Sequence, residues 1–236
     1  MAGGSSVSLL DSLKPSELAA LRPHLERVSL TAEQRLSTPG RPIKHAYFPI
    51  QGMISLVYRY STGAMIEVGM IGREGFWGGS LIAGVASSPV DAMVQGDGQA
   101  FRVPAKAFMK AVDGNPGLKA HLLLHNQFLQ VQTAITAACN GLHTIQPRLA
   151  RWLLEAHDRL GDGDMLLKHE FLSYMLGVRR AGITSTLATL KAKGLIETGR
   201  GSLRIKNRKG LEAEACECYQ IVKKEYRRIF SPKATA

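Results

Sequence analysis

Arginines and short polar side chains recur along residues 179–191 in a pattern that suits hydrogen bonding to DNA bases. Arg179 and Arg180 are adjacent, and Thr184, Ser185 and Lys191 follow on the same side of a helical repeat. An arginine at the start of a helix in the major groove can reach O6 and N7 of one guanine together. Short hydroxyl side chains allow close approach to base edges. The pattern predicts a recognition helix from Arg179 to about Lys193.

Three flanking elements would position this helix. Residues 168–176 have apolar side chains at helical spacing, and Gly177 can adopt the positive φ of a tight helix-to-helix turn. Residues 195–198 and 203–205 flank Gly199-Arg200-Gly201 and predict a two-stranded wing. Together these segments predict a winged helix-turn-helix. The predicted DNA contacts are Lys168, His169, Ser173, Arg179, Arg180, Thr184, Ser185, Lys191 and Arg200.

The charge distribution favours a polyanionic partner. Residues 179–209 contain nine Lys or Arg and a single acid, Glu197, whereas residues 1–114 contain 11 basic and 9 acidic side chains. The formal net charge of the whole chain is +11, so most of it lies in the C-terminal half. The alternative is an ordinary helical hairpin and β-hairpin with solvated charges. Such a surface would mix the two signs.

Length and cysteine content limit the class of protein. The chain has 236 residues, enough for two domains, and 45% of them are hydrophobic. Residues 1–6 lack the features of a signal peptide, and no apolar run reaches the roughly 18 residues of a membrane span. The only cysteines, Cys139, Cys216 and Cys218, are an odd number that does not make a disulfide framework. We therefore expect a cytoplasmic protein without a membrane partner.

Two weak metal-binding patterns occur. Cys216 and Cys218 are two thiols without further ligands nearby in the sequence, which makes an incomplete site. His121 and His125 are one helical turn apart, but no third ligand accompanies them. A solvent-facing His121 and a packed or seam-lining His125 are the better interpretation. The sequence thus predicts no metal site and no cofactor.

The N-terminal half changes from helix to strand. Residues 8–28 form a helical pattern broken at Pro15, and residues 45–50, 52–60 and 65–71 are short β-rich segments separated by glycine turns. Many short strands with glycine corners predict a small barrel. Residues 104–112 then predict a short helix with proline at its start.

A long helical pattern from Leu118 to about Cys139 carries an apolar stripe near heptad spacing. The stripe is either an intramolecular packing face or a dimer seam, and we favour the seam because helix-turn-helix proteins commonly bind twofold sites. The predicted seam residues are Leu118, Leu122, His125, Phe128, Leu129, Gln132, Ile135 and Cys139. A second helix over residues 146–160 should face inward with Trp152 and outward with Arg148, Arg151, Glu155 and Arg159.

The order of these elements resembles the Crp/Fnr family of bacterial transcription regulators, over nearly the whole chain. The most specific pieces are Glu170-Phe171-Leu172 to Gly177-Val178-Arg179-Arg180, then Gly194-Leu195-Ile196, and the tail from Gly210 to Tyr219. The resemblance implies an α+β fold with an N-terminal β jelly-roll like a cyclic-nucleotide-binding domain (residues 1–116), a long dimerisation helix (117–141) and a C-terminal winged helix-turn-helix (142–236).

The chain departs from the cyclic-nucleotide binders of that family. Gly79 stands where they have a glutamate after the barrel glycine, and no Arg or Lys occurs between Gly75 and Phe101. A buried phosphate would meet no countercharge, so we expect weak or no cyclic AMP binding unless the long helix compensates. The candidate effector pocket is the turn that could still offer backbone amides to an anion, Gly78, Gly79, Ser80 and Leu81. The clustered N-terminal cysteines of the oxygen-sensing branch are absent, since the first cysteine is Cys139.

The sequence therefore predicts a transcription regulator, not an enzyme, that binds a palindromic site in double-stranded DNA as a homodimer. RNA polymerase and an unidentified small effector are further candidate partners. The alternative is a ligand-sensing barrel whose basic C-terminal unit binds RNA or a protein. An enzyme with a regulatory barrel is disfavoured, because the segments above fill the chain.

Overall fold

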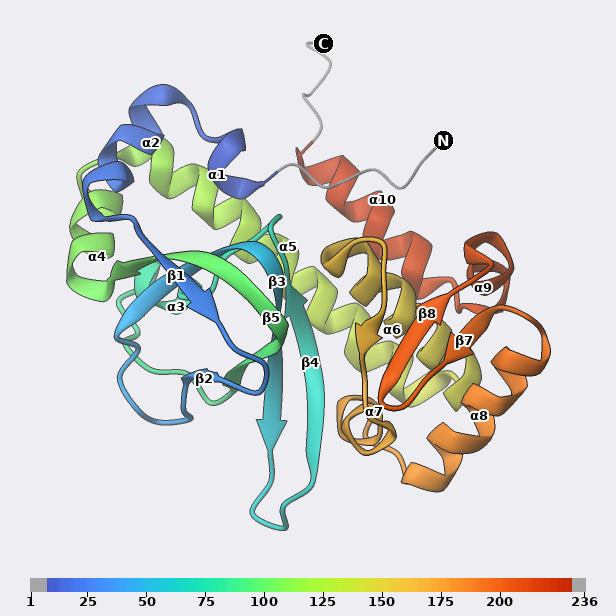
Figure 1. Cartoon of the computed structure of the whole chain (residues 1–236). Helices are drawn as coiled ribbons and strands as arrows, with labels where there is room; N and C mark the ends of the chain where they lie inside the picture. The colour runs from blue at the N-terminus through green and yellow to red at the C-terminus, as the bar shows by residue number, and fades with distance from the viewer. Residues whose placement is uncertain (1–7, 231–236) are drawn as a thin grey trace.

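The long helix α5 (Pro116–Leu142) connects a domain of antiparallel strands to a helical C-terminal domain in the computed structural model (Figure 1). The structure describes residues 8–230. Residues 1–6, on which the expectation about a signal peptide rests, lie outside the described residues. No helix within residues 8–230 has the length and apolar character needed to cross a membrane.

Short helices at the start of the described residues cover one end of the sheet domain. Pro15 starts the second of them, and the Glu17 carboxylate accepts a hydrogen bond from the Lys14 amide at 3.0 Å, which caps it. The predicted break at Pro15 is confirmed, although a strand already begins at Glu26. The elements are α1 (Leu9–Ser12), α2 (Pro15–Leu21) and the 3-10 helix η1 (Arg22–His24).

Five antiparallel strands form a curved sheet in the order β1-β5-β3-β4, with β2 also pairing with β5. The two predicted segments 45–50 and 52–60 are one strand, because β3 bends at Gly52 (φ 91°) without leaving its pairing with β5. The path has two open ends, β1 and β4, and does not close into a barrel. The strands are β1 (Glu26–Leu30), β2 (Arg35–Ser37), β3 (His45–Arg59), β4 (Met65–Ile71) and β5 (Asp91–Pro104).

Large apolar side chains fill the interior of the sheet domain. The rings of Phe48 and Phe76 stack at 5.5 Å, and Phe108 packs on both at 6.2 and 5.9 Å. Phe108 comes from α4 (Ala105–Asp113), which agrees with the predicted short helix, and the turn helix α3 (Gly79–Ile82) adds Leu81 to this core. Each such side chain contributes roughly 2 to 3 kcal/mol through burial.

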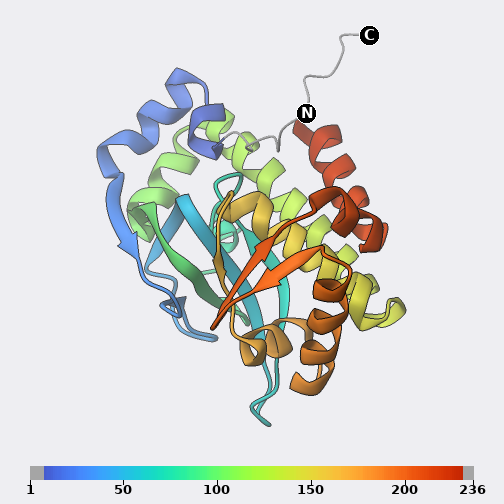
Figure 2. The same ribbon diagram turned by 45° about the vertical axis from the view of Figure 1, so that its right-hand side comes forward.

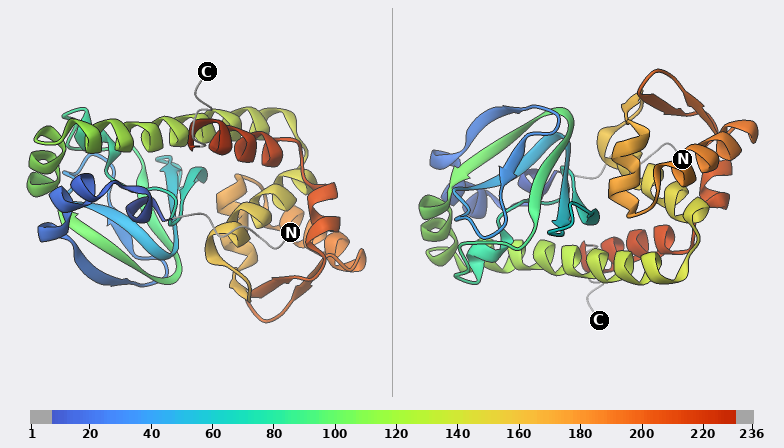
Figure 3. Two further views of the ribbon diagram at one scale, coloured as in Figure 1. Left: turned by 90° about the horizontal axis from the view of Figure 1, so that it is seen from above. Right: turned by 90° about the horizontal axis from the view of Figure 1, so that it is seen from below.

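A terminal helix that the sequence did not suggest covers α5. Helix α10 (Cys218–Phe230) lies along the inner side of α5 in both views of Figure 3. The Phe230 ring stacks on His125 at 4.3 Å, and Tyr226 meets Phe128 at 5.2 Å. His125 is therefore packed, in agreement with one of the two interpretations of that residue.

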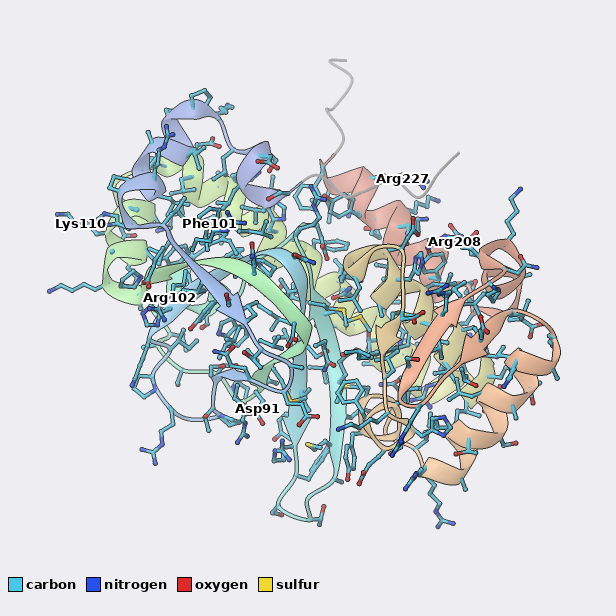
Figure 4. All side chains as sticks on the ribbon, viewed as in Figure 1. Asp91, Phe101, Arg102, Lys110, Arg208 and Arg227 are labelled. Carbon is cyan, nitrogen blue, oxygen red and sulfur yellow. The ribbon has the colours of Figure 1, made fainter. Side chains whose placement is uncertain are left out.

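The C-terminal domain contains the predicted helix-turn-helix and wing. Its short sheet has the order β6-β8-β7, and β6 is a strand that the sequence did not predict. Arg208, labelled in Figure 4, donates to Asp158 and Tyr219 at 2.5 Å each and so connects α9 to α6 and α10. The elements are α6 (Ile145–Leu160), β6 (Met165–Leu166), α7 (His169–Leu176), α8 (Arg180–Ala192), β7 (Ile196–Thr198), β8 (Ser202–Ile205) and α9 (Arg208–Glu214).

The charged side of α6 faces inward, which corrects the prediction that it faces solvent. The side chains of Arg151 and Glu155 are 3% and 4% exposed and pair at 3.0 Å, while Arg148 is buried as well. Arg159 pairs with Glu74 of the sheet domain at 2.7 Å, with side chains 7% and 8% exposed. The prediction failed because amphipathic periodicity assumes that one helix side meets water, whereas α6 is enclosed between the two domains.

Glu67 of β4 is a buried acid at this domain junction. It accepts hydrogen bonds from Ser55 and, at 2.8 Å, from Trp152 Nε1 of α6. Burial raises the pKa of Glu67 from its ordinary 4.5 to about 7, against the opposing effect of these two donors. The folded chain therefore holds a proton here that the unfolded chain releases above pH 4.5. The contribution of Glu67 to stability is complete below pH 4.5 and decreases as the pH rises to about 7.

We expect the Glu67→Gln substitution to remove this pH dependence, because the amide keeps an acceptor for Trp152 but does not ionise. Relative to the unsubstituted protein, the variant should gain up to about 3 kcal/mol in free energy of unfolding between about pH 4.5 and pH 8. Urea denaturation at several pH values measures this change. The exposed Glu217→Gln is the control, and parallel pH profiles for Glu67→Gln and the unsubstituted protein would contradict the assignment.

Candidate nucleic-acid interface

A left-handed glycine forms the corner of the helix-turn-helix. Gly177 has φ +62°, and a Cβ built there would lie 2.9 Å from Ile66 Cδ1 of β4. The left-handed backbone conformation favours glycine, and a larger residue would also have to displace the end of the Ile66 side chain. The Val178 amide donates to the Ser173 carbonyl at 3.0 Å and closes the turn. Figure 2 shows α7 beside β4, so the sheet domain supports the DNA-binding unit directly.

Helix α8 has the two faces that its sequence predicts. Ile183, Leu187 and Leu190 are at most 2% exposed and pack in the core of the C-terminal domain. The opposite face consists of exposed residues from the predicted recognition set, Arg179, Arg180, Thr184, Ser185 and Lys191. The observed helix begins at Arg180 and ends at Ala192, one residue inside each predicted bound.

Some of the basic side chains in residues 179–209 form ion pairs with acidic side chains of the same chain, and others do not. Four form ion pairs within the chain, and these are Lys193 with Glu214, Arg204 with Asp164, Lys206 with Glu197 and Arg208 with Asp158. Arg179, Arg180, Lys191, Arg200 and Lys209 form no ion pair with any residue in 8–230. Lys209 is on α9, whereas the other four lie at the start and outer face of α8 and at the wing tip. These positions are where a DNA backbone or base edge would be contacted.

The first turn of α8 adds a second source of positive potential. It contains no acidic residue that would neutralise the positive end of the helix dipole, and the amides of Arg180 and Ala181 precede the first hydrogen bond of the helix. Backbone amides at such a helix start bind phosphate oxygens. Arg179 is the N-cap and Arg180 the first residue of α8, so two cationic side chains originate at the same helix end.

The remaining predicted DNA contacts are less uniform. Lys168 is 76% exposed and forms a 3.6 Å ion pair with Glu33, a contact too solvated to compete with phosphate. His169 Nδ1 lies 3.0 Å from Thr184 Oγ1, so these two side chains position each other. The prediction that Ser173 contacts DNA is corrected, because this residue is 7% exposed and its hydroxyl donates to the Glu170 carbonyl at 2.6 Å. Its side chain is a helix-internal contact, not a surface contact.

The wing carries Arg200 at an exposed tip. Strands β7 and β8 pair in antiparallel register from Ile196↔Ile205 to Thr198↔Leu203, and Gly201 has φ +75° in the turn. This conformation favours glycine at position 201. The third strand, β6, pairs with β8 through Met165↔Leu203 and anchors the wing to the domain.

The predicted effector turn is packed against the long helix. Gly78 has φ +115°, and a side chain on Gly79 would collide with Asn126 of α5. Leu81 is 2% exposed and belongs to the hydrophobic core, so its inclusion in a pocket is corrected. The residue that α5 places against this turn is neutral and supplies no countercharge for a phosphate. A surface hollow of about 560 Å³ lies elsewhere, between α2 and α4, and includes Lys106 and Lys110.

The predicted dimer seam lies inside its own chain. Six of its eight residues are at most 7% exposed, and Leu129 and Ile135 are half-buried. The sheet domain covers the first part of the stripe, and α10 covers the later part. The stripe is therefore the intramolecular packing face that the periodicity also allowed. The six buried residues are Leu118, Leu122, His125, Phe128, Gln132 and Cys139.

A different stripe of α5 is open to solvent. Its members alternate three and four residues apart, which is the heptad spacing of a coiled-coil seam. Leu124 is 47% exposed and its neighbour Leu123 is 45% exposed, so two adjacent large apolar side chains of α5 are open to solvent. The stripe, which we call the outer stripe, consists of the half-buried Val131 and six exposed residues, Ala120, Leu124, Gln127, Ala134, Ala138 and Gly141.

The structure also brings together cysteines and a histidine that the sequence separates. Cys216 and Cys218 meet Cys139 and His143 from the end of α5. Neither metal pattern considered from the sequence contained this set. The available signal was the four-residue spacing of Cys139 and His143, which places both on one side of a helix.

Comparisons with known proteins identify the C-terminal domain and the fold. Residues 147–214 match the family model of the Crp-like helix-turn-helix domain. Comparison of the sequence with curated proteins finds no match. Several of the similar solved structures are described as transcriptional regulators.

Three of these structures illustrate the likeness. FixK2 from Bradyrhizobium japonicum has a TM-score of 0.68 at 18% identity, with 81% of this chain and 98% of that chain covered. A CRP/FNR family regulator from Thermus thermophilus has a TM-score of 0.67 at 22% identity, with 80% and 98% covered. The c-di-GMP responsive regulator CLP from Xanthomonas campestris has a TM-score of 0.64 at 15% identity, with 81% and 99% covered. The fold of this chain is thus the fold of these regulators.

Proposed function

We propose that this chain, a DNA-binding transcription regulator with the fold of Crp/Fnr regulators and a Crp-like helix-turn-helix domain, binds a palindromic site as a homodimer. The observation that carries the proposal is the outer face of α8, where Arg179, Arg180 and Lys191 are exposed and form no ion pair with a described residue. Arg180 reads a base edge, while Lys191 and Arg200 contact phosphates.

The outer stripe of α5 is the proposed dimer seam. Two copies of α5 packed along it would bury Leu124 and Val131 against their equivalents, while the small alanines allow the helices to approach closely. The inner side of α5 is occupied by α10, so this surface is the one left for a second copy. Twofold symmetry then places two α8 helices in successive major grooves, about 34 Å apart.

We further propose that the effector, if the dimer responds to one, is not cyclic AMP. The turn at Gly78 and Gly79 presents no cationic side chain, and the neighbouring residue of α5 is the neutral Asn126. The aromatic cluster of Phe48, Phe76 and Phe108 fills the interior of the sheet domain. An anionic nucleotide there would lose hydration without gaining an ion pair.

We expect the Arg180→Ala substitution to relax base preference at one position of each half-site, at a cost of about 1 to 3 kcal/mol for the preferred sequence. Lys191→Ala should instead weaken binding to all sequences alike and reduce the salt dependence by about one phosphate contact. Selection from a random duplex pool followed by titration on the recovered site measures both. Arg22→Ala, an exposed arginine of the N-terminal region, is the matched control.

Three outcomes would oppose the proposed DNA interface. Unchanged affinity and preference in Arg180→Ala would show that α8 is not the recognition helix. Recovery of single-stranded RNA rather than duplex DNA, from a pool containing both, would favour the alternative of an RNA-binding unit. Loss of binding in Arg22→Ala would show that the measured affinity reflects overall charge.

We expect the Leu124→Glu substitution to dissociate the dimer, because twofold symmetry places the two carboxylates opposite each other in an apolar seam. The dissociation constant of the dimer should rise by about 100-fold or more, since like charges at such a seam cost several kcal/mol. Sedimentation equilibrium measures it. Leu166→Glu, at a position 72% exposed in the C-terminal domain, is the control. A dimer that persists in Leu124→Glu would place the interface elsewhere.

A further inference from the structure

Four potential metal ligands converge where the end of α5 meets the start of α10. Cys139 is on the last turns of α5, His143 caps that helix, and Cys216 and Cys218 flank the start of α10. Their donor atoms all lie within 4.8 Å of one another. The three cysteines are 0%, 8% and 5% exposed and form no disulfide. Three buried thiols and a half-buried imidazole thus lie in one small volume.

The donor spacing matches the edges of a tetrahedron around one ion. Zinc binds sulfur at about 2.3 Å and nitrogen at about 2.0 to 2.1 Å, which places two sulfurs about 3.8 Å apart and a sulfur and a nitrogen about 3.6 Å apart. Cys139 Sγ and Cys216 Sγ are separated by 3.5 Å, and Cys218 Sγ and His143 Nδ1 by 3.7 Å. Small side-chain movements would complete the coordination.

The donor types select the ion. Three thiolates and one imidazole form a soft set that suits zinc and excludes magnesium and calcium, which require oxygen ligands. Four protein ligands leave no open position, which is the arrangement of structural zinc sites rather than catalytic ones. Donor atoms this close leave room for one ion and not for an iron-sulfur cluster.

The surroundings offset the charge of such a site. Zinc with three thiolates and a neutral imidazole carries one net negative charge, and the three thiol protons pass to solvent on binding. Two buried guanidinium groups of α6, Arg148 and Arg151, interact electrostatically with Cys139 and Cys216. The Nε atoms of both arginines have no hydrogen-bond partner among the described residues. Both arginines therefore retain capacity to stabilise negative charge at the cluster.

We propose that Cys139, His143, Cys216 and Cys218 bind one zinc ion that joins the C-terminal end of α5 to the start of α10. A disulfide between Cys139 and Cys216 is the competing explanation, but it would use two of the four donors and leave Cys218 and His143 unexplained. The zinc site does not depend on DNA binding. It fixes the N-terminal end of α10, whose far end covers His125 and Phe128.

Metal content and cobalt spectroscopy test the site directly. The untagged protein, purified under reducing conditions and dialysed against zinc, should contain about one zinc per chain by elemental analysis. Replacement by Co²⁺ should produce visible bands of tetrahedral cobalt and sulfur-to-cobalt charge transfer. The Cys216→Ser/Cys218→Ser double variant should lose both signals, and His143→Asn should bind zinc at least about tenfold more weakly. His24→Asn, an exposed histidine far from the cluster in sequence, should bind zinc normally.

Thermal unfolding supplies a second readout. Chelation should lower the melting temperature of the unsubstituted protein, because zinc binds the folded chain far better than the unfolded one. It should leave the melting temperature of the double variant unchanged. If circular dichroism shows that the double variant does not fold, the test of the zinc site rests on the zinc affinity of His143→Asn and on the cobalt spectrum of the unsubstituted protein. A reduced protein that takes up neither zinc nor cobalt, or a Cys139–Cys216 disulfide found in their place by mass spectrometry, overturns the proposal.

Discussion

One constraint governs the molecule, which is that α5 must bury a continuous face along its whole length. A helix of 27 residues is about 40 Å long, so it extends beyond the sheet domain. Leu118 and Leu122 meet the core of that domain, and farther along the Gln132 side chain accepts from the Met70 amide at 3.1 Å. The C-terminal segment covers the rest of this face, through α10 at His125 and Phe128 and through Cys216 at Cys139. The C-terminal segment is therefore part of the structure that keeps α5 folded, and it leaves the outer stripe as the remaining uncovered side.

The buried charges of α6 fix how the two domains lie together. Trp152 donates to Glu67, and Arg159 pairs with Glu74, so two polar contacts cross the junction between α6 and the sheet domain. Such contacts add little net stability, but removing one partner leaves an unpaired buried group that costs several kcal/mol. They therefore favour one relative orientation strongly over its neighbours. A regulator that changes the spacing of its two recognition helices would have to break or exchange these contacts.

The sequence predicts structures that depend on neighbouring residues, but it does not predict which surfaces are buried by distant segments of the chain. The periodicity of residues 179–193, Gly177 and the glycines around Arg200 each predict a structure that depends on few distant residues, and all three agree with the observed turn, helix and wing. Burial of Ser173, Arg151 and the α5 stripe depends instead on surfaces supplied from elsewhere in the chain. The sequence patterns did not predict helix α10, and without that helix the apolar stripe of α5 looks like an interface with a second chain. For the same reason, the sequence patterns did not place Cys216 and Cys218 beside Cys139 and His143.

The position of the cysteine and histidine cluster has a consequence for the whole molecule. His143 is the residue at which α5 ends, and α6 begins two residues later, so the cluster lies at the joint between the long helix and the DNA-binding domain. The Cys216 amide also contacts the Pro147 carbonyl at 3.4 Å, which connects the same segment to the start of α6. Rotation of the C-terminal domain about this joint would pull the ligands of α5 away from those of α10. Binding an ion there opposes that rotation, so coordination chemistry at one joint and buried polar pairs at the domain junction restrain the same movement.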